Sequence, residues 1–331
     1  MKKYTLILGI FILLITLLGG GFFLYLNRGL AHDIKAAEFS CLDLQEGTFT
    51  TFDTLPNHIY GIGLSYAGHI NETASSFDPD TDPPAFRKAV SSITGNQSSV
   101  SIPTKETLLH AVDQIEPGLG AELQARALTL PALLDYEVEL AFVLLEDVDP
   151  LVLATEGYAP KIGFFIANDL SARSLAILGE GQKDRYEYWG VSKSFSGFTP
   201  VSSQIWIPNT FQPSAIPCIM LETQVNGEVR QRQSTSDMIY TPLQMLRVVQ
   251  RRYPNTTLKK GDWVLMGTPG GVVLSTSRWL VRLANMLGMD RFKKLANKTK
   301  NTEVAKFLKP GDTVITTGEG LGSVEIEIVA E

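Results

Sequence analysis

Residues 135–145 read Asp-Tyr-Glu-Val-Glu-Leu-Ala-Phe-Val-Leu-Leu, an apolar run that begins with two glutamates at alternate positions. Side chains alternate between the two faces of a strand, so Glu137 and Glu139 point to one face while Val138 and Leu140 point to the other. Two carboxylates that face the same way repel each other unless a cation lies between them. A hard divalent cation such as Mg²⁺ suits them, although a solvent-facing strand with two glutamates explains this segment equally well.

A third carboxylate and one histidine stand out elsewhere in the chain. Asp169 follows the apolar stretch 162–167 and is either a further ligand or a loop or capping residue. His69 is followed three residues later by Glu72, so Glu72 can orient His69 as a general base. A structural histidine is the alternative, and the residues alone leave both questions open.

The rest of the chain shows many short strand patterns separated by Gly, Pro and Asn. Residues 225–228 contain Asn-Gly, which suits the positive φ angles of a hairpin turn. Residues 324–328 alternate apolar and acidic side chains, and residues 263–266 form an apolar run after a turn. Helical patterns are fewer and lie at residues 106–115, at 243–252 and after Ser275. These patterns predict a β-rich α+β fold rather than an alternating βαβ one.

The composition limits the class of protein. The 331 residues are 44% hydrophobic and 19% charged, which is enough apolar material for a large core. The net charge is −6, and it is −9 without the first 28 residues, so we expect no nucleic-acid partner. Two cysteines exclude a disulfide-rich scaffold, and four histidines without an H-E-x-x-H pattern exclude the usual helical zinc hydrolase. We therefore expect oxygen ligands for any metal.

The amino-terminal segment predicts a membrane anchor. Tyr4–Leu26 is a run of 23 residues without a charge, and at ~1.5 Å per residue a helix of that length spans the ~30 Å hydrocarbon layer. The run is longer than a signal-peptide core, although small residues at Gly29 and Ala31 also suit cleavage before His32. The flanking positive charges favour a single-pass membrane protein with its catalytic domain on the non-cytoplasmic side.

Several ordered blocks of sequence resemble the fumarylacetoacetate hydrolase family, and together they cover most of Tyr60–Val329. They are Gly61–Tyr66 with His69 and Glu72, Pro84–Lys88, Asp135–Leu140, Asn168–Arg173, Lys193–Phe198, Val225–Glu228, Gly267–Val272, and Lys309–Asp312 with Gly320–Gly322. The resemblance implies the mixed β-sandwich or roll of that family's C-terminal domain and a homodimer, and the uncharged run Tyr4–Leu26 adds one expected transmembrane helix before it, which is unusual for the family. The expected divisions are an anchor at 1–28, a tether and leading element at 29–56, and a catalytic domain at 57–331.

The resemblance also implies a role for individual residues. The implied ligands of Mg²⁺ (or Mn²⁺ or Ca²⁺) are Glu137, Glu139 and Asp169, and the implied catalytic residues are His69, Glu72 and Lys193. His69 with Glu72 would be the base, and Lys193 would stabilise an enolate as a fixed positive charge. Arg173 and Thr268 would bind the oxygens of the substrate.

These roles lead to three hypotheses about function. The first is a metal-dependent hydrolase that cleaves a C–C bond in an acylpyruvate-like or β-diketo acid through a metal-stabilised enolate. The second keeps the site but makes the enzyme a decarboxylase, isomerase or hydratase of a small 2-oxo acid. The third is a membrane-tethered binding protein without turnover.

The chain departs from the family pattern at positions that bear on the substrate. Ala176 stands where many members have Gln, which removes one hydrogen-bond donor, and Lys193 is followed by Ser-Phe-Ser where Ser-Phe-Asp is common. Residues 274–306 form an insertion that compact members lack. Its part Arg278–Lys300 is basic and carries an apolar stripe at helical spacing, so it either packs as an extra helix or lies on a membrane surface.

Overall fold

A seven-stranded sheet runs through the middle of the computed structural model, which describes residues 20–21, 34–72, 81–126, 128–183, 185–274, 286, 288–300 and 306–331, without the side chains of Asn71 and Glu72. In spatial order the strands are β2 (Gly47–Thr51), β12 (Gln204–Pro208), β9 (Ile162–Asn168), β8 (Val138–Leu144), β16 (Trp263–Leu265), β3 (Ile59–Ile62) and β4 (Ala85–Lys88). Neighbouring strands are antiparallel except β16 and β3. Every residue of β8 and β9 is buried, so these two strands form the centre of the fold.

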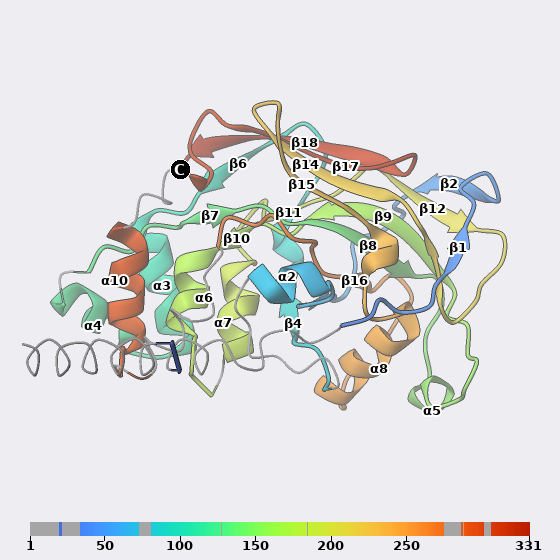
Figure 1. Ribbon diagram of the computed structural model, residues 1–331, viewed down its shortest axis with the longest axis horizontal. Coiled ribbons are helices and arrows are strands. Elements are labelled where there is room, and N and C mark those ends of the chain that lie inside the picture. Colours follow the sequence, from blue (N-terminus) through green and yellow to red (C-terminus); the bar gives the residue numbers. More distant parts are fainter. Residues whose placement is uncertain are drawn as a thin grey trace, which may run out of the picture.

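A five-stranded sheet lies over β8 and β9 (Figure 1). In order, its strands are β15 (Glu228–Ser234), β14 (Met220–Val225), β17 (Thr313–Gly318), β18 (Gly322–Ala330) and β6 (Ser98–Ile102). The predicted hairpin turn joins β14 to β15, with φ angles of 52° at Asn226 and 82° at Gly227. In β18, Val324, Ile326 and Ile328 are buried while the glutamates between them are exposed, so the predicted alternation is confirmed.

The two sheets approach each other closely where β17 ends. A Cβ atom at Gly318 would come within 2.2 Å of Ile166 Cδ1 on β9, so a larger residue would force the side chain of Ile166 to shift. Interiors as dense as this leave no room for an added methyl group. Leu140 and Phe142 of β8 pack in the same core cluster as Leu221 of β14.

The helices gather at the two ends of the sheets (Figure 1). At one end are α3 (Lys105–Ile115), α4 (Leu119–Ala125), α6 (Arg173–Leu178), α7 (Arg185–Ser192) and α10 (Arg291–Lys300), and at the other are α5 (Pro150–Leu153) and α8 (Pro242–Arg252). The predicted helices at 106–115 and 243–252 are confirmed as α3 and α8. Thr104 caps α3 through the Thr107 N–H, and Thr241 with Gln244 forms a capping box before Pro242 in α8. Short elements are α2 (Ala67–Glu72), η1 (Val90–Ser92) and η2 (Thr235–Asp237).

Three pairs of short strands complete the fold. They are β1 (Ser40–Leu42) with β13 (Ala215–Pro217), β5 (Ile93–Thr94) with β11 (Thr199–Pro200), and β7 (Leu134–Asp135) with β10 (Ser171–Ala172). A disulfide joins Cys41 to Cys218, with their Cα atoms 5.1 Å apart. This bond attaches the leading segment to the body of the protein, and the sequence did not indicate it.

The described part of the insertion, α10, packs as an extra helix. Phe292 and Leu295 are buried in the core cluster to which α3, α4 and α6 also contribute. Arg291 donates two hydrogen bonds to the carboxylate of Glu116, both at 2.7 Å. The packed-helix interpretation therefore holds for α10, while residues 275–285 of the insertion lie outside the described residues.

The predicted membrane localisation is corrected by the structure. Among the described residues, no helix is long and apolar enough to cross a membrane. The longest of them, α3 and α8, have 11 residues, or about 16 Å of helix against the ~30 Å of a hydrocarbon layer. The prediction of a single-pass membrane protein with its catalytic domain on the non-cytoplasmic side is wrong on this finding. Its basis, Tyr4–Leu26, lies outside the described residues except for Gly20 and Gly21.

Candidate metal centre

Three carboxylates meet where β8 begins and β9 ends. Val138 pairs with Asn168 in the antiparallel register, so Glu137 and Asp169 leave the two strands side by side. The Asp169 N–H donates to the Glu137 carbonyl at 2.8 Å, and the Glu137 N–H donates to Asn168 Oδ1 at 3.0 Å. Glu139 is the second residue of β8, two positions after Glu137, so the two side chains lie on the same strand face. Strand register therefore brings the three predicted ligands to one end of the central sheet.

The geometry of this carboxylate trio fits a hard divalent cation. Glu137, Glu139 and Asp169 each offer an oxygen, these oxygens lie within 4.8 Å of one another, and all three residues are buried. Mg²⁺, Mn²⁺ and Ca²⁺ prefer carboxylate oxygens, whereas Zn²⁺ sites are usually built with His or Cys. The donor set contains neither of those two residue types.

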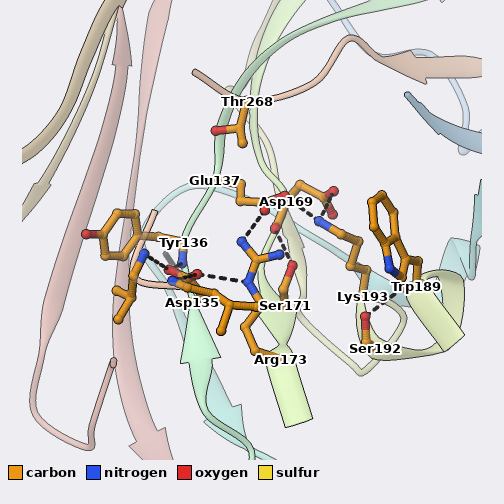
Figure 2. A network of polar contacts seen from close by, with 12 residues as sticks. Asp135, Tyr136, Glu137, Asp169, Ser171, Arg173, Trp189, Ser192, Lys193 and Thr268 are labelled. Carbon is orange, nitrogen blue, oxygen red and sulfur yellow. Dashed lines mark hydrogen bonds and ion pairs between the residues drawn. The ribbon is translucent and has the colours of Figure 1, made fainter. Parts of the chain in front are cut away.

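Two positively charged side chains that were expected in the site contact the carboxylate trio directly (Figure 2). Lys193, which follows α7, donates through Nζ to Asp169 Oδ2 at 2.6 Å and also to Glu137. Arg173, the first residue of α6, donates through Nε to Asp135 Oδ2 at 2.8 Å and through Nη2 to Glu137. The positive charges that the sequence assigned to catalysis and substrate binding thus lie against the carboxylates.

Burial and neighbouring charges shift the pKa values of Glu139, Glu137 and Lys193. Burial raises the pKa of Glu139 well above its usual value, and the neighbouring Asp169 and Glu137 raise it further. Burial also opposes ionisation of Glu137, but Arg173 and Lys193 together bring its pKa below the usual range. Although burial disfavours charge on Lys193, Asp169 and Glu137 hold its pKa above normal. Among the three carboxylates, Glu139 is therefore the one whose negative charge is least compensated by neighbouring positive charges.

The segment Gly267–Leu274 closes the other side of the site. The Gly267 N–H donates to Glu139 Oε2 at 2.7 Å, at a φ of 92°. A Cβ there would lie 2.5 Å from Ser65 Oγ, so this close approach requires glycine. Thr268 is buried, and its Oγ1 accepts a hydrogen bond from Gln231 Nε2 at 2.9 Å. In the view of Figure 2, Glu137 lies between Thr268 and Arg173.

His69 lies on the short helix α2 and is 7% exposed. Burial lowers the pKa of His69 to about 4, and the charges of Glu137, Arg173 and Lys193 also act on it. The ring is therefore neutral at pH 7, the state that a general base requires. The side chain of Glu72 lies outside what the structure describes, so the predicted dyad stays a prediction.

Sequence reasoning missed three buried polar residues around the trio. Lys88, at the end of β4, donates to Asp169 and to the Phe198 carbonyl, the latter at 2.9 Å. Asp135 holds Arg173, and Gln231 holds Thr268. Lys88 and Asp135 lay in the blocks quoted from the sequence, but a single charged residue at the end of an apolar strand does not reveal its partner.

The family model described as fumarylacetoacetate (FAA) hydrolase C-terminal matches residues 58–329. The chain belongs to the fumarylacetoacetate hydrolase family. The resemblance implied a β-rich mixed β-sandwich or roll, and the match confirms a fold of this family's type that mixes helices and strands, as well as membership of an enzyme family.

Named relatives in the family differ in reaction. The oxaloacetate tautomerase YisK of Bacillus subtilis is 27% identical over 271 residues, which are 82% of this chain and 69% of the relative. A protein of Pyrococcus abyssi without an assigned activity is 28% identical over 280 residues, 85% of this chain and 93% of its own. The fold also matches a fumarylpyruvate hydrolase of Pseudomonas aeruginosa, solved with Mn²⁺ and pyruvate, at 18% identity and a TM-score of 0.54 over 92% of this chain and 100% of that one. The relatives by sequence thus include tautomerases, and the solved structures of similar fold are named as an isomerase and a hydrolase.

Proposed function

We propose that this protein is a divalent-metal-dependent enzyme that acts on a small 2-oxo acid through an enolate. The observation that carries the proposal is the buried trio of Glu137, Glu139 and Asp169, with Lys193 and Arg173 in contact with it. Three buried carboxylates crowded together suit a divalent cation, and two fixed cations beside them suit an anionic substrate. Membership of the family and the 2-oxo acids named for its members support this choice.

Each predicted residue has a task in this proposal. A divalent cation held by the trio would supply positive charge that lowers the energy of an enolate. Lys193 would add a second positive charge beside the trio, where its ammonium group contacts Glu137 and Asp169. Arg173 and Thr268 bind the oxygens of the substrate. His69, neutral at pH 7, accepts the proton whose removal forms the enolate or activates water.

The proposed site is compatible with two reactions, tautomerisation and hydrolysis. For tautomerisation, His69 takes a proton from the carbon next to the keto group, and the enolate oxygen then receives a proton to give the enol; the same steps in reverse convert the enol into the keto acid. For hydrolysis, His69 takes a proton from water, the hydroxide attacks the acyl carbonyl, and the C–C bond breaks to leave the enolate of the pyruvate half. The curated oxaloacetate tautomerases support the first reaction, and the sequence resemblance led to the second. A homodimer and the divisions at 29–56 and 57–331 remain proposals from the resemblance.

A substrate panel tests the proposal. Purified protein is mixed with oxaloacetate and with acylpyruvates, with and without Mn²⁺, and the loss of enol absorbance is followed. Nuclear magnetic resonance then separates the outcomes, because tautomerisation gives only the keto form, hydrolysis gives pyruvate and a carboxylic acid, and decarboxylation of oxaloacetate gives pyruvate and CO₂. Metal-independent rates, or no turnover of any 2-oxo acid, would refute the proposal.

A pair of variants assigns the activity to the trio. Glu139→Gln should weaken Mn²⁺ binding and abolish turnover, because it removes an anionic ligand. Glu327→Gln is the matched control: it also changes a strand glutamate next to apolar residues, but that glutamate is exposed on β18. If Glu139→Gln binds Mn²⁺ as tightly as the wild type does, the ligand assignment is wrong.

A further inference from the structure

Asp135 lies at the junction of the two elements that carry the proposed substrate-binding residues. It is completely buried and is the second residue of β7. Its strand pairs with β10, which immediately precedes Arg173 at the start of α6. Asp135 does not belong to the carboxylate trio, and both of its oxygens accept hydrogen bonds from N–H donors.

Each carboxylate oxygen of Asp135 accepts two hydrogen bonds. Oδ2 accepts from Arg173 Nε at 2.8 Å and from the Leu274 N–H at 3.3 Å. Oδ1 accepts from the Tyr136 N–H at 3.0 Å and from the Val273 N–H at 3.1 Å. Figure 2 shows the carboxylate of Asp135 below Glu137, with its bond to Arg173. One side chain thus ties the start of α6 to the end of the segment that carries Thr268.

The same strand also receives the chain on its way back from the insertion. The Leu308 N–H donates to the Leu134 carbonyl at 2.8 Å. The chain therefore enters the insertion beside Asp135 and returns beside Leu134, the residue before it. The two ends of the insertion are thus both hydrogen-bonded to β7.

We propose that Asp135 is a positioning residue that holds the guanidinium of Arg173 and the Thr268 segment in register for the substrate. The proposal rests on the function proposed above. Arg173 uses Nε and Nη2 on Asp135 and Glu137, and this two-point attachment fixes the plane of its guanidinium. The donors that remain on Arg173 then have one defined direction in which to meet a substrate carboxylate.

The isosteric amide is the decisive change. In Asp135→Asn, one oxygen becomes an NH₂ group of the same size, which donates and cannot accept. Turned one way, the NH₂ opposes Arg173 Nε and the Leu274 N–H; turned the other way, it opposes the Tyr136 and Val273 N–H groups. Either orientation sets donor against donor at one of the two elements that Asp135 joins.

The test separates positioning from stability. With Mn²⁺ present, Asp135→Asn should raise KM for the 2-oxo acid that the wild type turns over, and the dissociation constant of pyruvate, by about tenfold to a hundredfold, the usual effect of losing a charged hydrogen bond. The effect on kcat should be smaller. Asp262→Asn is the matched control, because Asp262 is equally buried and accepts from the His58 and Lys259 N–H groups away from the trio. It should lower Tm and leave KM unchanged.

The outcomes distinguish this assignment from the proposed function. If Asp135→Asn lowers Tm as the control does but keeps the KM and pyruvate affinity of the wild type, Asp135 is only structural and the assignment is refuted. A wild type that neither turns over a 2-oxo acid nor binds pyruvate refutes the proposed function and this assignment with it. If Asp135→Asn shows no cooperative melting transition, Asp135→Glu replaces it, since it keeps both acceptors and should give an increase in KM; unchanged KM there also refutes the assignment.

Discussion

Acidification is expected to destabilise the folded protein through His69. Burial lowers the pKa of this histidine from the usual 6.5 to about 4. The unfolded chain therefore binds a proton as the pH falls through 6.5, whereas the folded protein does so only near pH 4. Stability contributed by the neutral ring is present above pH 6.5 and is lost between pH 6.5 and 4.

The magnitude follows from the two pKa values. Each pKa unit corresponds to about 1.4 kcal/mol, so protonation of His69 costs about 3 kcal/mol more in the folded protein than in the unfolded chain. His69→Gln removes the titrating group and keeps a polar side chain. Between pH 7 and pH 4, the free energy of unfolding should fall by about 3 kcal/mol less in the variant than in the wild type. The other acidic groups titrate in both proteins, so the difference isolates this residue.

Urea unfolding at a series of pH values measures this difference directly. Tryptophan fluorescence and circular dichroism should report the same transition before the free energies are compared. The same variant should lower kcat by about 10²–10⁴, the usual effect of losing a general base. If the stability curves of variant and wild type stay parallel from pH 7 to pH 4, His69 is not held neutral by burial, and the argument for a neutral base fails.

Two further predictions concern the scaffold. Reduction of the Cys41–Cys218 disulfide, which spans 177 residues of sequence, should lower the free energy of unfolding by about 5 kcal/mol on the chain-entropy model. Urea unfolding with and without a dithiol measures this difference. A double Cys→Ser variant whose stability still responds to the dithiol would contradict the assignment. Leu295→Ala should cost about 2–5 kcal/mol because Leu295 on α10 is completely buried; a loss below 1 kcal/mol in the same assay would mean that α10 is not part of the core.

The pair of glutamates on one strand face could be expected because its signal is local in the sequence, whereas the addition of Asp169 as a third ligand came from the family resemblance. Alternation along a strand places Glu137 and Glu139 on one face, and the structure shows both beside Asp169. Asp169 follows the next strand of the sheet, so an antiparallel pairing of two neighbouring strands is enough to bring it there. The hairpin at 225–228 was equally local, since Asn-Gly suits its turn.

The supports of the site could not be predicted, because they come from distant parts of the chain. Lys88 reaches Asp169 across 81 residues of sequence, and Asp135 receives the Val273 N–H across 138. Cys41 and Cys218 are both found in segments without a strong pattern. A single sequence shows which residues share a strand face, but not which strands of two sheets become neighbours. The membrane prediction failed differently, since it rested on Tyr4–Leu26, which lies outside the described residues except for Gly20 and Gly21.

The buried carboxylates and positively charged side chains of this site form an ion cluster, which also limits how the site can change in evolution. Removing one member of a buried ion pair costs about 3–5 kcal/mol, while a domain is stable by only about 5–15 kcal/mol. A substitution that alters charge is therefore tolerated best when a second one compensates it, so neutral neighbours are the easier route to a new substrate. Ala176, one turn after Arg173 on α6, is such a position, because it can change the shape of the helix face without changing any charge. The members of the cluster are Asp135, Glu137, Glu139 and Asp169 on the acidic side and Lys88, Arg173 and Lys193 on the basic side.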